Sequence, residues 1–197
     1  PQNFVRGRLV RDELSVFRLP SFRPRRILDL GCGPGAATFA ALTHFPEAQI
    51  EARAVDASSP FLNILKRRFD ENRALWPSAS LNAETGDLLD VKSDADLILV
   101  SFALNEAMES RMEDEARTWL RRWLDRLAPD GVMVILEPVS QATSERLERL
   151  RNWVAENKAA RILGPCLHYA ACPLLNKGEA WCHEVRRWRI PETLEIL

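Results

Sequence analysis

The sequence contains no long hydrophobic run. No apolar stretch approaches the roughly 20 residues that a helix needs to cross a bilayer, so we expect no membrane partner. The first residues are polar and rich in arginine, and they lack the apolar core of a secretory signal peptide. These two features therefore argue against a protein anchored by a membrane-spanning helix and against one with a visible secretion signal.

The chain also lacks a strong net charge, which is only −1, but its charges are unevenly distributed. Residues 1–26 carry a net charge of +5, residues 27–157 carry −8, and residues 158–197 carry +2. Basic segments are candidate contacts for nucleic acid. Charge by itself favours the alternative, which is an ordinary solvated surface.

The remaining composition is that of an ordinary globular domain. The 197 residues suffice for one domain with a sizeable core, and 46% of them are hydrophobic and 28% charged. We divide the chain into a lead-in over residues 1–25, a core over residues 26–160, and a cysteine-rich metal-binding segment and tail over residues 161–197. The lead-in is expected to hold a short helix over residues 10–17, after which Pro20 ends regular structure.

The most informative stretch runs from Ile27 to Gly35, where an apolar run ends in an acid and three alternate glycines follow. This order predicts a strand, a tight turn and a helix N-terminus, which bring backbone N–H groups close to a bound nucleoside. The glycines are Gly31, Gly33 and Gly35, whereas a dinucleotide fingerprint needs its third glycine one position later. The spacing therefore favours S-adenosyl-L-methionine (SAM), which has no pyrophosphate. The alternative is the glycine turn of an ordinary βα unit, and Cys32 is interpreted as a packed thiol.

Strand-like and helix-like segments alternate through the core. Apolar runs predict strands over residues 26–31, 49–56, 81–85, 96–104 and 132–136. Helical patterns predict helices over residues 36–44 and 109–127, and two more that begin at Ser58 or Ser59 and at Thr143 or Ser144. This alternation predicts an α/β fold with a doubly wound, mostly parallel, Rossmann-like sheet.

Two of these helices have a recognisable buried face. In the helix after Ser59, the residues Phe61, Leu65 and Phe69 repeat every four positions, with Leu62 beside them, and predict its buried stripe. The apolar residues of the helix over 109–127 also follow a helical period, and we expect them to face the core: Met112, Ala116, Trp119, Leu120, Trp123, Leu124 and Leu127.

The glycine stretch resembles motif I of class I methyltransferases, which bind SAM. Asp56 ends the second predicted strand, 21 residues after Gly35, where an acid binds ribose hydroxyls in this kind of fold. The resemblance implies that Asp87 bonds the adenine amino group, although an Asp after a Gly also commonly forms a turn. It further implies that Asp29 orients the loop or the amino group of SAM, and that Ser101 belongs to the cofactor site.

Cysteines are few, and three of the four are clustered. Cys166, Cys172 and Cys182 lie within 17 residues, a pattern more typical of metal binding than of disulfides in an intracellular protein. Their thiolates suit zinc, with His168 or His183 as a fourth ligand, or an iron–sulfur cluster. The alternative is that they are three small buried hydrophobic residues.

Two segments narrow the resemblance. Cys166-x5-Cys172-Pro-Leu with Trp181-Cys182-His183, and Ser101-Phe-Ala-Leu-Asn105-Glu106, are similar to a methyltransferase-like family that acts in assembly of the mitochondrial small ribosomal subunit and has bacterial relatives. The resemblance covers roughly residues 24–185 and implies small-subunit ribosomal RNA or a ribosome precursor as the partner. It also implies a 4Fe–4S cluster on four cysteines, of which three match here and the fourth lies beyond Leu197.

These features predict a SAM-binding methyltransferase-like protein that acts on or docks to small-subunit ribosomal RNA. Asn105 and Glu106 are the only polar pair at the end of the fourth strand and are the weak candidates for catalysis. The Asn-Pro-Pro-Tyr motif of amino-methylating relatives is absent there, so the first alternative is a catalytically inactive ribosome-assembly factor with a 4Fe–4S cluster. The second alternative is a small-molecule methyltransferase with structural zinc.

Three further expectations concern the extent and the location of the chain. Class I methyltransferases finish with two more strands, which we do not find together in residues 183–197, and this predicts a sheet truncated or abbreviated at its C-terminus. The chain starts at Pro1 rather than at Met, which also favours a fragment. The lack of an Arg- and Ser-rich transit peptide favours a bacterial cytoplasm, with the mitochondrial matrix as the alternative.

Overall fold

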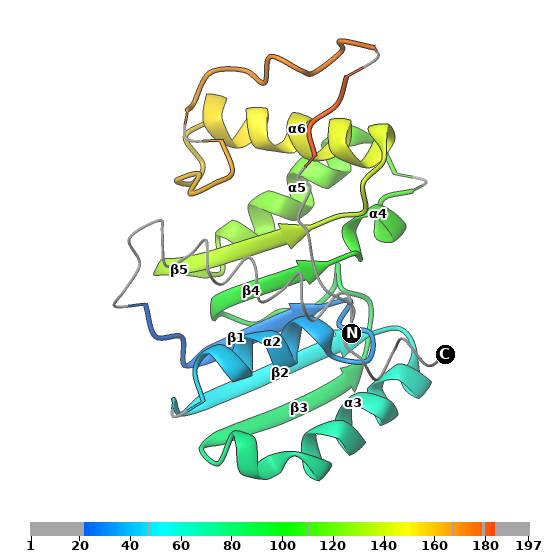
Figure 1. The fold of residues 1–197 in the computed structure, drawn as a ribbon. Coiled ribbons are helices and arrows are strands. Elements are labelled where there is room, and N and C mark those ends of the chain that lie inside the picture. The colour runs from blue at the N-terminus through cyan, green and yellow to red at the C-terminus, as the bar shows by residue number, and fades with distance from the viewer. Residues whose placement is uncertain (1–21, 47, 110, 167, 179, 184–197) are drawn as a thin grey trace, which may run out of the picture.

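The computed structural model of the chain describes residues 22–46, 48–109, 111–166, 168–178 and 180–183 (Figure 1). The predicted helix over residues 10–17 lies outside these ranges, and so do residues 184–197. Within the described part of the chain, no helix is long and apolar enough to cross a membrane.

Five parallel strands form one sheet in the order β3-β2-β1-β4-β5. Their bounds are β1 Arg26–Leu30, β2 Ile50–Asp56, β3 Ala79–Thr85, β4 Ala95–Ser101 and β5 Leu127–Leu136. The chain builds outward from β1 to β3 and then returns to place β4 on the other side of β1. This reversal creates the switch point at which open α/β sheets bind ligands, outside the carboxyl ends of the strands. The predicted α/β fold with a parallel sheet is confirmed.

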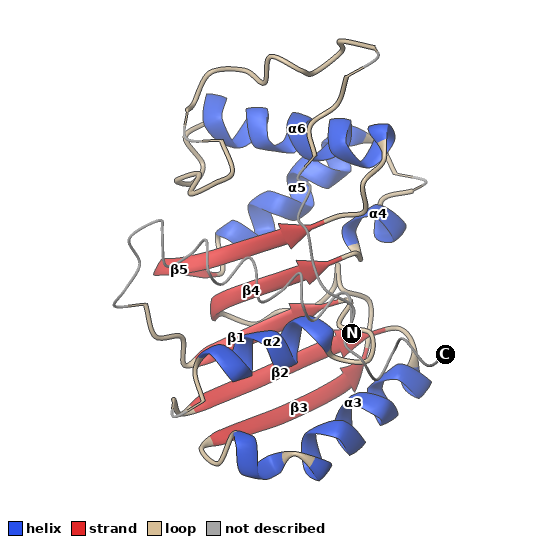
Figure 2. Ribbon diagram, viewed as in Figure 1, coloured by secondary structure: helices blue, strands red, loops and turns tan. Residues whose placement is uncertain are grey.

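Helices cover both faces of the sheet (Figure 2). Their bounds are α2 Ala36–His44, α3 Ser59–Glu71, α4 Leu104–Ala107, α5 Glu113–Leu124 and α6 Gln141–Glu156, with a 3₁₀ turn over Arg73–Leu75. Side chains of β1 alternate between the two layers: Ile27 packs with α2, whereas Leu28 and Leu30 pack with α5 and α6. Burial on both faces explains why β1 and β4 are apolar at almost every position.

The connection after β4 differs from the predicted strand over residues 96–104. β4 ends at Ser101 because Phe102 adopts a left-handed conformation with φ of 60°. The backbone N–H of Phe102 still donates to the carbonyl of Leu136 at 2.7 Å, and the short helix α4 follows. The chain therefore turns sharply at the carboxyl edge of the sheet, where a straight strand would have continued past it.

Two predicted packing positions are wrong. Met112 is the residue before α5 and is 76% exposed. The backbone N–H of Met112 donates to the side chain of Glu115 at 2.9 Å, and the helix begins after it, at Glu113. Phe61 of α3 is 47% exposed, while Leu62, Leu65 and Phe69 face the sheet. Three of the four residues of the predicted stripe are therefore buried, and only Phe61 is not.

Three element boundaries were also placed too late. The helix predicted over residues 109–127 ends at Leu124, and the strand predicted over residues 132–136 already begins at Leu127, opposite a register shift in which Ala95 pairs with Leu127 and Leu97 pairs with Val132. The last helix begins at Gln141, and the hydroxyl of Ser140 accepts a hydrogen bond from the backbone N–H of Thr143 at 3.3 Å. A Ser at this position satisfies one of the free N–H groups at a helix start.

Candidate functional site

The glycine loop is fixed to the end of β2 by backbone hydrogen bonds. The N–H groups of Gly31 and Cys32 both donate to the carbonyl of Val55, at 2.8 and 3.0 Å. The N–H of Gly35 closes the turn by donating to the carbonyl of Cys32 at 2.9 Å. The loop therefore lies at the carboxyl edge of the sheet, beside the switch point between β1 and β4.

Two of the three glycines are required by packing. A Cβ on Gly31 would lie 2.2 Å from the Cβ of Ala103, and a Cβ on Gly35 would lie 2.2 Å from the Cδ1 of Leu65. Gly33 differs, because no atom of the described residues lies within 4 Å of the place where its Cβ would be. Only at Gly33 does the loop leave open space beside its backbone, which is where a ligand can approach.

Asp29 is completely buried at the end of β1. Its Oδ2 accepts hydrogen bonds from the backbone N–H of Thr38 at 2.9 Å and from the Thr38 hydroxyl at 2.6 Å. Burial raises the pKa of Asp29 to about 6, against the lowering effect of the two bonds from Thr38. Its Oδ1 has no hydrogen-bond partner within the described residues. Asp29 therefore orients the start of α2, and one oxygen atom remains for a further donor.

Asp56 braces the glycine loop from the end of β2. Its Oδ2 accepts the N–H of Gly33 at 2.7 Å, and its Oδ1 accepts the N–H of Ser58 at 2.8 Å. A carboxylate oxygen can accept more than one hydrogen bond, so each retains capacity for a ribose hydroxyl. The structure thus places Asp56 beside the one open glycine, which the sequence spacing did not show.

Asp87 lies in the next loop along the same edge and is exposed. Its Oδ1 accepts the N–H of Leu89 at 2.8 Å, which is the turn-forming role weighed as the alternative. The N–H of the preceding Gly86 donates to the carbonyl of Asp56 at 3.1 Å and ties this loop to the end of β2. Asp87 and Asp56 therefore belong to the same edge of the sheet.

The sequence analysis missed Glu137, a half-buried residue that organises the edge of β4. Its Oε1 accepts the N–H of Leu104 at 3.1 Å, and its Oε2 accepts the N–H of Asn105 at 3.2 Å. Burial raises the pKa of Glu137 to about 7, against the lowering effect of these two bonds. One signal could have found it, because Glu137 directly follows β5 as Asp56 ends β2.

The catalytic candidates of the sequence lie on α4, but they are placed differently from each other. Asn105 is half-buried, and Arg146 donates to both its backbone carbonyl and its Oδ1, at 3.2 and 3.3 Å. Glu106 is exposed, whereas Ser101 is half-buried at the last position of β4. Arg146, from α6, is a second residue of this edge that the sequence analysis missed.

Cys32 is buried beside Leu62, Leu65 and two alanines of the sheet. Burial raises the pKa of its thiol, so the neutral form is favoured. Such a thiol is a poor metal ligand, and the interpretation of Cys32 as a packed side chain agrees with its position.

The cysteine segment lies along α6, in orange in Figure 1. The backbone N–H of Cys172 donates to the Oδ1 of Asn152 at 2.9 Å, and the N–H of Cys182 donates to the Oε1 of Glu148 at 3.1 Å. Both acceptors are buried side chains of α6. Cys166, Cys172 and Cys182 are half-buried and form no disulfide.

The described residues do not fit a complete metal site. No three of their His, Cys, Asp and Glu side chains come together in a way that could hold an ion. Arg151 of α6 binds the backbone carbonyls of His168 and Ala170 and lies 3.3 Å from the Nδ1 of His168. The Nδ1 of His183 lies 3.0 Å from the carbonyl of Trp181. The arrangement of this segment is therefore set by its hydrogen bonds to α6.

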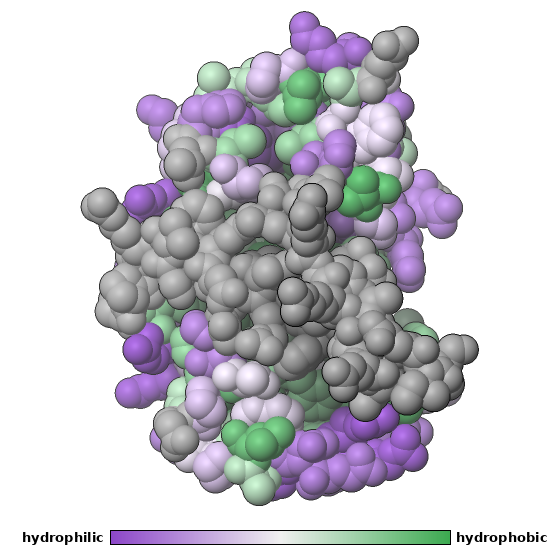
Figure 3. All heavy atoms as spheres, viewed as in Figure 1, coloured by the Kyte–Doolittle hydropathy of each residue, from purple (hydrophilic) through white to green (hydrophobic). Residues whose placement is uncertain are grey.

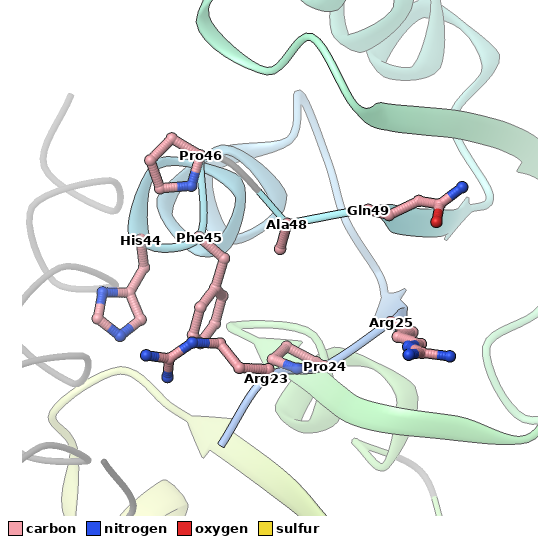
Figure 4. Close-up of a pocket in the computed structure, with 8 residues that line it drawn as sticks. All are labelled: Arg23, Pro24, Arg25, His44, Phe45, Pro46, Ala48 and Gln49. Carbon is pink, nitrogen blue, oxygen red and sulfur yellow. The ribbon is translucent and has the colours of Figure 1, made fainter. Parts of the chain in front are cut away.

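A pocket of about 580 Å³ opens at the opposite edge of the sheet, where β1 and β2 begin and α2 ends (Figure 4). It is lined by Arg23, Pro24, Arg25, His44, Phe45, Pro46, Ala48 and Gln49. Because the glycine loop lies at the carboxyl ends of the strands, this pocket at the amino ends is separate from the candidate cofactor site.

The chain is similar to known proteins both in sequence and in structure. The family model described as mitochondrial small ribosomal subunit Rsm22 matches residues 3–192. The Rsm22-cox11 tandem protein 2, mitochondrial, of Schizosaccharomyces pombe is 26% identical over 167 residues, which cover 78% of this chain and 21% of that protein. The trans-aconitate 2-methyltransferase of Mycobacterium tuberculosis is 33% identical over 125 residues, which cover 62% of this chain and 41% of that enzyme.

Among solved structures, Streptomyces venezuelae DesVI superimposes with a TM-score of 0.50 and 17% identity, covering 72% of this chain and 53% of that chain. At this level of identity the match shows a shared fold. The chain spans only about a fifth to two fifths of the length of the two relatives compared above.

Proposed function

We propose that this chain, which belongs to the Rsm22 family of the mitochondrial small ribosomal subunit, binds SAM at the carboxyl edge of its sheet. We further propose that it acts on or docks to small-subunit ribosomal RNA. The methyltransferase-like fold agrees with the first part of this proposal. The family description supports the second part, and the name of the fission-yeast relative supports the mitochondrial matrix as one candidate compartment.

The observation that carries the cofactor assignment is the open backbone at Gly33 beside Asp56. A SAM molecule at this position would lie beside the open backbone of Gly33, and Asp56 would accept hydrogen bonds from the ribose hydroxyls of SAM. Asp87, on the adjoining loop, would receive the adenine amino group. The buried Oδ1 of Asp29 and the hydroxyl of Ser101 would complete the polar groups on the methionine side.

SAM supplies a methyl group activated by a positively charged sulfur. Transfer of that group requires mainly that the acceptor atom be held in line, so the contribution of the protein is position. Glu137 and Arg146 provide this by holding α4 at the edge where an acceptor would approach. A general base is needed only if the acceptor must first lose a proton, and the exposed Glu106 is the candidate.

The proposal is tested by titration calorimetry with SAM, followed by transfer of a radiolabelled methyl group to small-subunit ribosomal RNA. We expect binding in the wild type and a loss of at least tenfold in affinity in Gly33→Ala, because the new methyl group would occupy the open space. Gly178→Ala, which has a similar positive φ but lies in the cysteine segment, is the matched control. Failure of the wild type to bind SAM would overturn the assignment.

The main alternative is a ribosome-assembly factor without catalytic activity. It is favoured by the state of Asn105, whose carboxamide oxygen already accepts a bond from Arg146. SAM binding without methyl transfer to any ribosomal RNA would select this alternative. A small-molecule methyltransferase, which the trans-aconitate relative brings into consideration, would methylate small acids and would not co-purify with ribosomal particles.

We also propose that Cys166, Cys172 and Cys182 bind a 4Fe–4S cluster together with a fourth ligand. The alternative is zinc. The position of all three cysteines on one segment held against α6 supports the proposal. The described residues alone do not complete the site. Iron, sulfide and zinc analysis of a longer chain purified without oxygen decides between them: a brown protein with four irons supports the cluster, and a colourless protein with zinc overturns it.

A further inference from the structure

The described end of the basic stretch at the start of the chain lies away from the candidate cofactor site, at the amino edge of the sheet. Residues 1–26 carry a net charge of +5, and the last described part of this stretch leads into the pocket at the amino edge of the sheet. Arg23 and Arg25 line that pocket from the approach to β1, and His44 and Gln49 line it from the end of α2 and the start of β2. Four hydrogen-bond donors thus come from segments far apart in the sequence.

The pocket has a basic lining, because none of its described lining residues is acidic. Two carboxylates at the start of β4, Asp94 and Asp96, are already paired with arginines. Asp96 binds the Arg26 guanidinium at 2.8 Å and accepts the backbone N–H groups of Arg25 and Arg26, each at 2.9 Å. Asp94 lies 3.6 Å from Arg126. The guanidinium of Arg25 makes no hydrogen bond or ion pair within the described residues, so its charge is available to a ligand.

The floor of the pocket is apolar and firmly packed. The ring of Phe45 is buried and lies edge-on to Phe22, with 6.2 Å between ring centroids, and 4.3 Å from the ring of His44. Figure 4 shows the side chain of Arg23 next to the ring of Phe45. A rigid apolar floor rimmed by cationic donors suits a group with an anionic part and a flat or apolar part, such as a nucleotide.

We propose that this pocket binds a phosphate-bearing nucleotide of small-subunit ribosomal RNA, with Arg23 and Arg25 contacting the phosphate. The proposal rests on the proposed function and names the surface that meets the RNA. One guanidinium group can donate two parallel hydrogen bonds to two oxygens of a phosphate, which makes arginine the preferred residue for this contact. The volume of about 580 Å³ is in the range of pockets that bind small molecules.

The location has a consequence for docking. The pocket lies at the amino ends of the strands and the glycine loop at their carboxyl ends, so RNA bound in the pocket would leave the SAM site uncovered. Four more arginines precede the pocket residues in the sequence, so positive charge continues along the chain: Arg6, Arg8, Arg11 and Arg18. This continuity along the chain favours a long polyanion such as RNA over an acidic peptide.

The test compares the wild type with R23A/R25A in binding a fluorescently labelled fragment of small-subunit ribosomal RNA over a series of salt concentrations. We expect the double variant to bind at least tenfold more weakly. The slope of log K against log salt should fall by about 1.4, the value for two lost phosphate contacts on a single strand. SAM affinity, measured by calorimetry, should be unchanged.

A charge-matched control is available on α3. Arg67 and Arg68 are exposed residues of that helix, along which Figure 3 shows a hydrophilic surface, and neither lines the pocket, so R67A/R68A removes the same charge outside it. The single variant Arg25→Gln guards against misfolding, since the structure shows no bond of the Arg25 side chain within its described part. Arg25→Gln should by itself lower the salt slope by about 0.7.

The outcomes separate the two proposals. Equal RNA affinity in R23A/R25A and R67A/R68A overturns the pocket and leaves the proposed function standing. Absence of RNA binding by the wild type overturns the proposed function and this inference with it. Displacement of the RNA by polyglutamate at the same charge concentration as by unlabelled RNA would assign the pocket to an acidic protein partner and overturn the RNA assignment.

Discussion

At the scale of single residues, the carboxyl edge of the sheet is built by very close approaches. The loop at Gly31 runs against Ala103 of the β4–α4 connection, so the glycine is required by a neighbour that is 72 positions away. The same edge holds two acids whose protonation is shifted by burial, Asp29 and Glu137. These features lead to two predictions.

Gly31→Ala should lower the free energy of unfolding by about 2–4 kcal/mol, because overpacking and a left-handed alanine each contribute. The new Cβ would lie 2.2 Å from that of Ala103. Gly178→Ala has a comparable φ of 73° with no described atom within 4 Å, and it should cost only about 1–2 kcal/mol. Urea unfolding of both variants measures the difference, and equal losses would contradict the packing argument.

Glu137→Gln should change how stability depends on pH. The pKa of Glu137 is about 7 in the folded protein and near 4.5 when unfolded, so its protonated form stabilises the fold at pH 5 and this contribution is lost as the pH rises through 7. Glutamine cannot ionise. The wild type should therefore lose stability relative to the variant between pH 5 and pH 8, on the order of 1–2 kcal/mol after allowance for partial exposure.

Asp29, a second acid at this edge of the sheet, also has a pKa raised by burial. Asp29, with a pKa of about 6, also favours the fold below that pH, but it is present in both proteins and cancels in the comparison. Urea unfolding of wild type and Glu137→Gln at the two pH values provides the measurement. A difference between the proteins that does not change with pH would show that Glu137 acts only through its hydrogen bonds.

At the scale of elements, α6 holds the cysteine segment through its polar side chains. Besides Glu148 and Asn152, which accept backbone N–H groups of cysteines, Gln141 donates to the carbonyl of Gly178 at 3.0 Å and Arg149 donates to Asn176 at 3.2 Å. The opposite face of α6 carries Leu150 and Val154 against α5 and the sheet. The helix is thus apolar toward the core and polar toward the cysteines.

Asn152→Ala should loosen the segment around Cys172 with little effect on the core. The variant leaves the N–H of the half-buried Cys172 without its acceptor, which costs about 1 kcal/mol locally. We expect Cys172 to react severalfold faster with a thiol reagent, as identified by mass spectrometry. Asn157→Ala, which removes an exposed amide that bonds within the same helix, is the control and should leave the thiol rates unchanged. Equal rates in the two variants would contradict the role of α6.

At the scale of the whole molecule, the sheet separates two surfaces. The glycine loop and the acids lie at the carboxyl ends of the strands, and the basic pocket lies at their amino ends. A parallel sheet buried on both faces connects them. Coupling between two distant sites requires an element with two discrete arrangements that both sites bias, and the described residues show one arrangement of this sheet.

SAM and RNA should therefore bind independently. We expect the dissociation constant for SAM to change by less than about fivefold when RNA is saturating, which is below the usual range of allosteric coupling. Calorimetric titration of SAM in the presence and absence of RNA measures this coupling. A larger change would mean that the RNA reaches the carboxyl edge, as a methylation substrate would, and would favour an enzyme over a docking factor.

The sequence by itself determined the order of strands and helices and the position of the glycine turn. These depend on local signals: apolar runs, helical periods and glycine spacing act within about ten residues, and the predicted strands 26–31 and 49–56 agree with the structure to within one residue. The family resemblance also followed from short motifs, and the family match over residues 3–192 confirmed it.

Only the tertiary structure decided which side chains meet. Glu137, which directly follows β5, accepts a backbone N–H of α4. Arg146 donates to Asn105, which lies 41 positions earlier in the chain. Asn152 of α6 accepts the backbone N–H of Cys172. Such contacts depend on the register between distant elements and on the left-handed turn at Phe102, which no local pattern specifies. For this reason the open space at Gly33 and the basic pocket became visible only when the strands were aligned in the sheet.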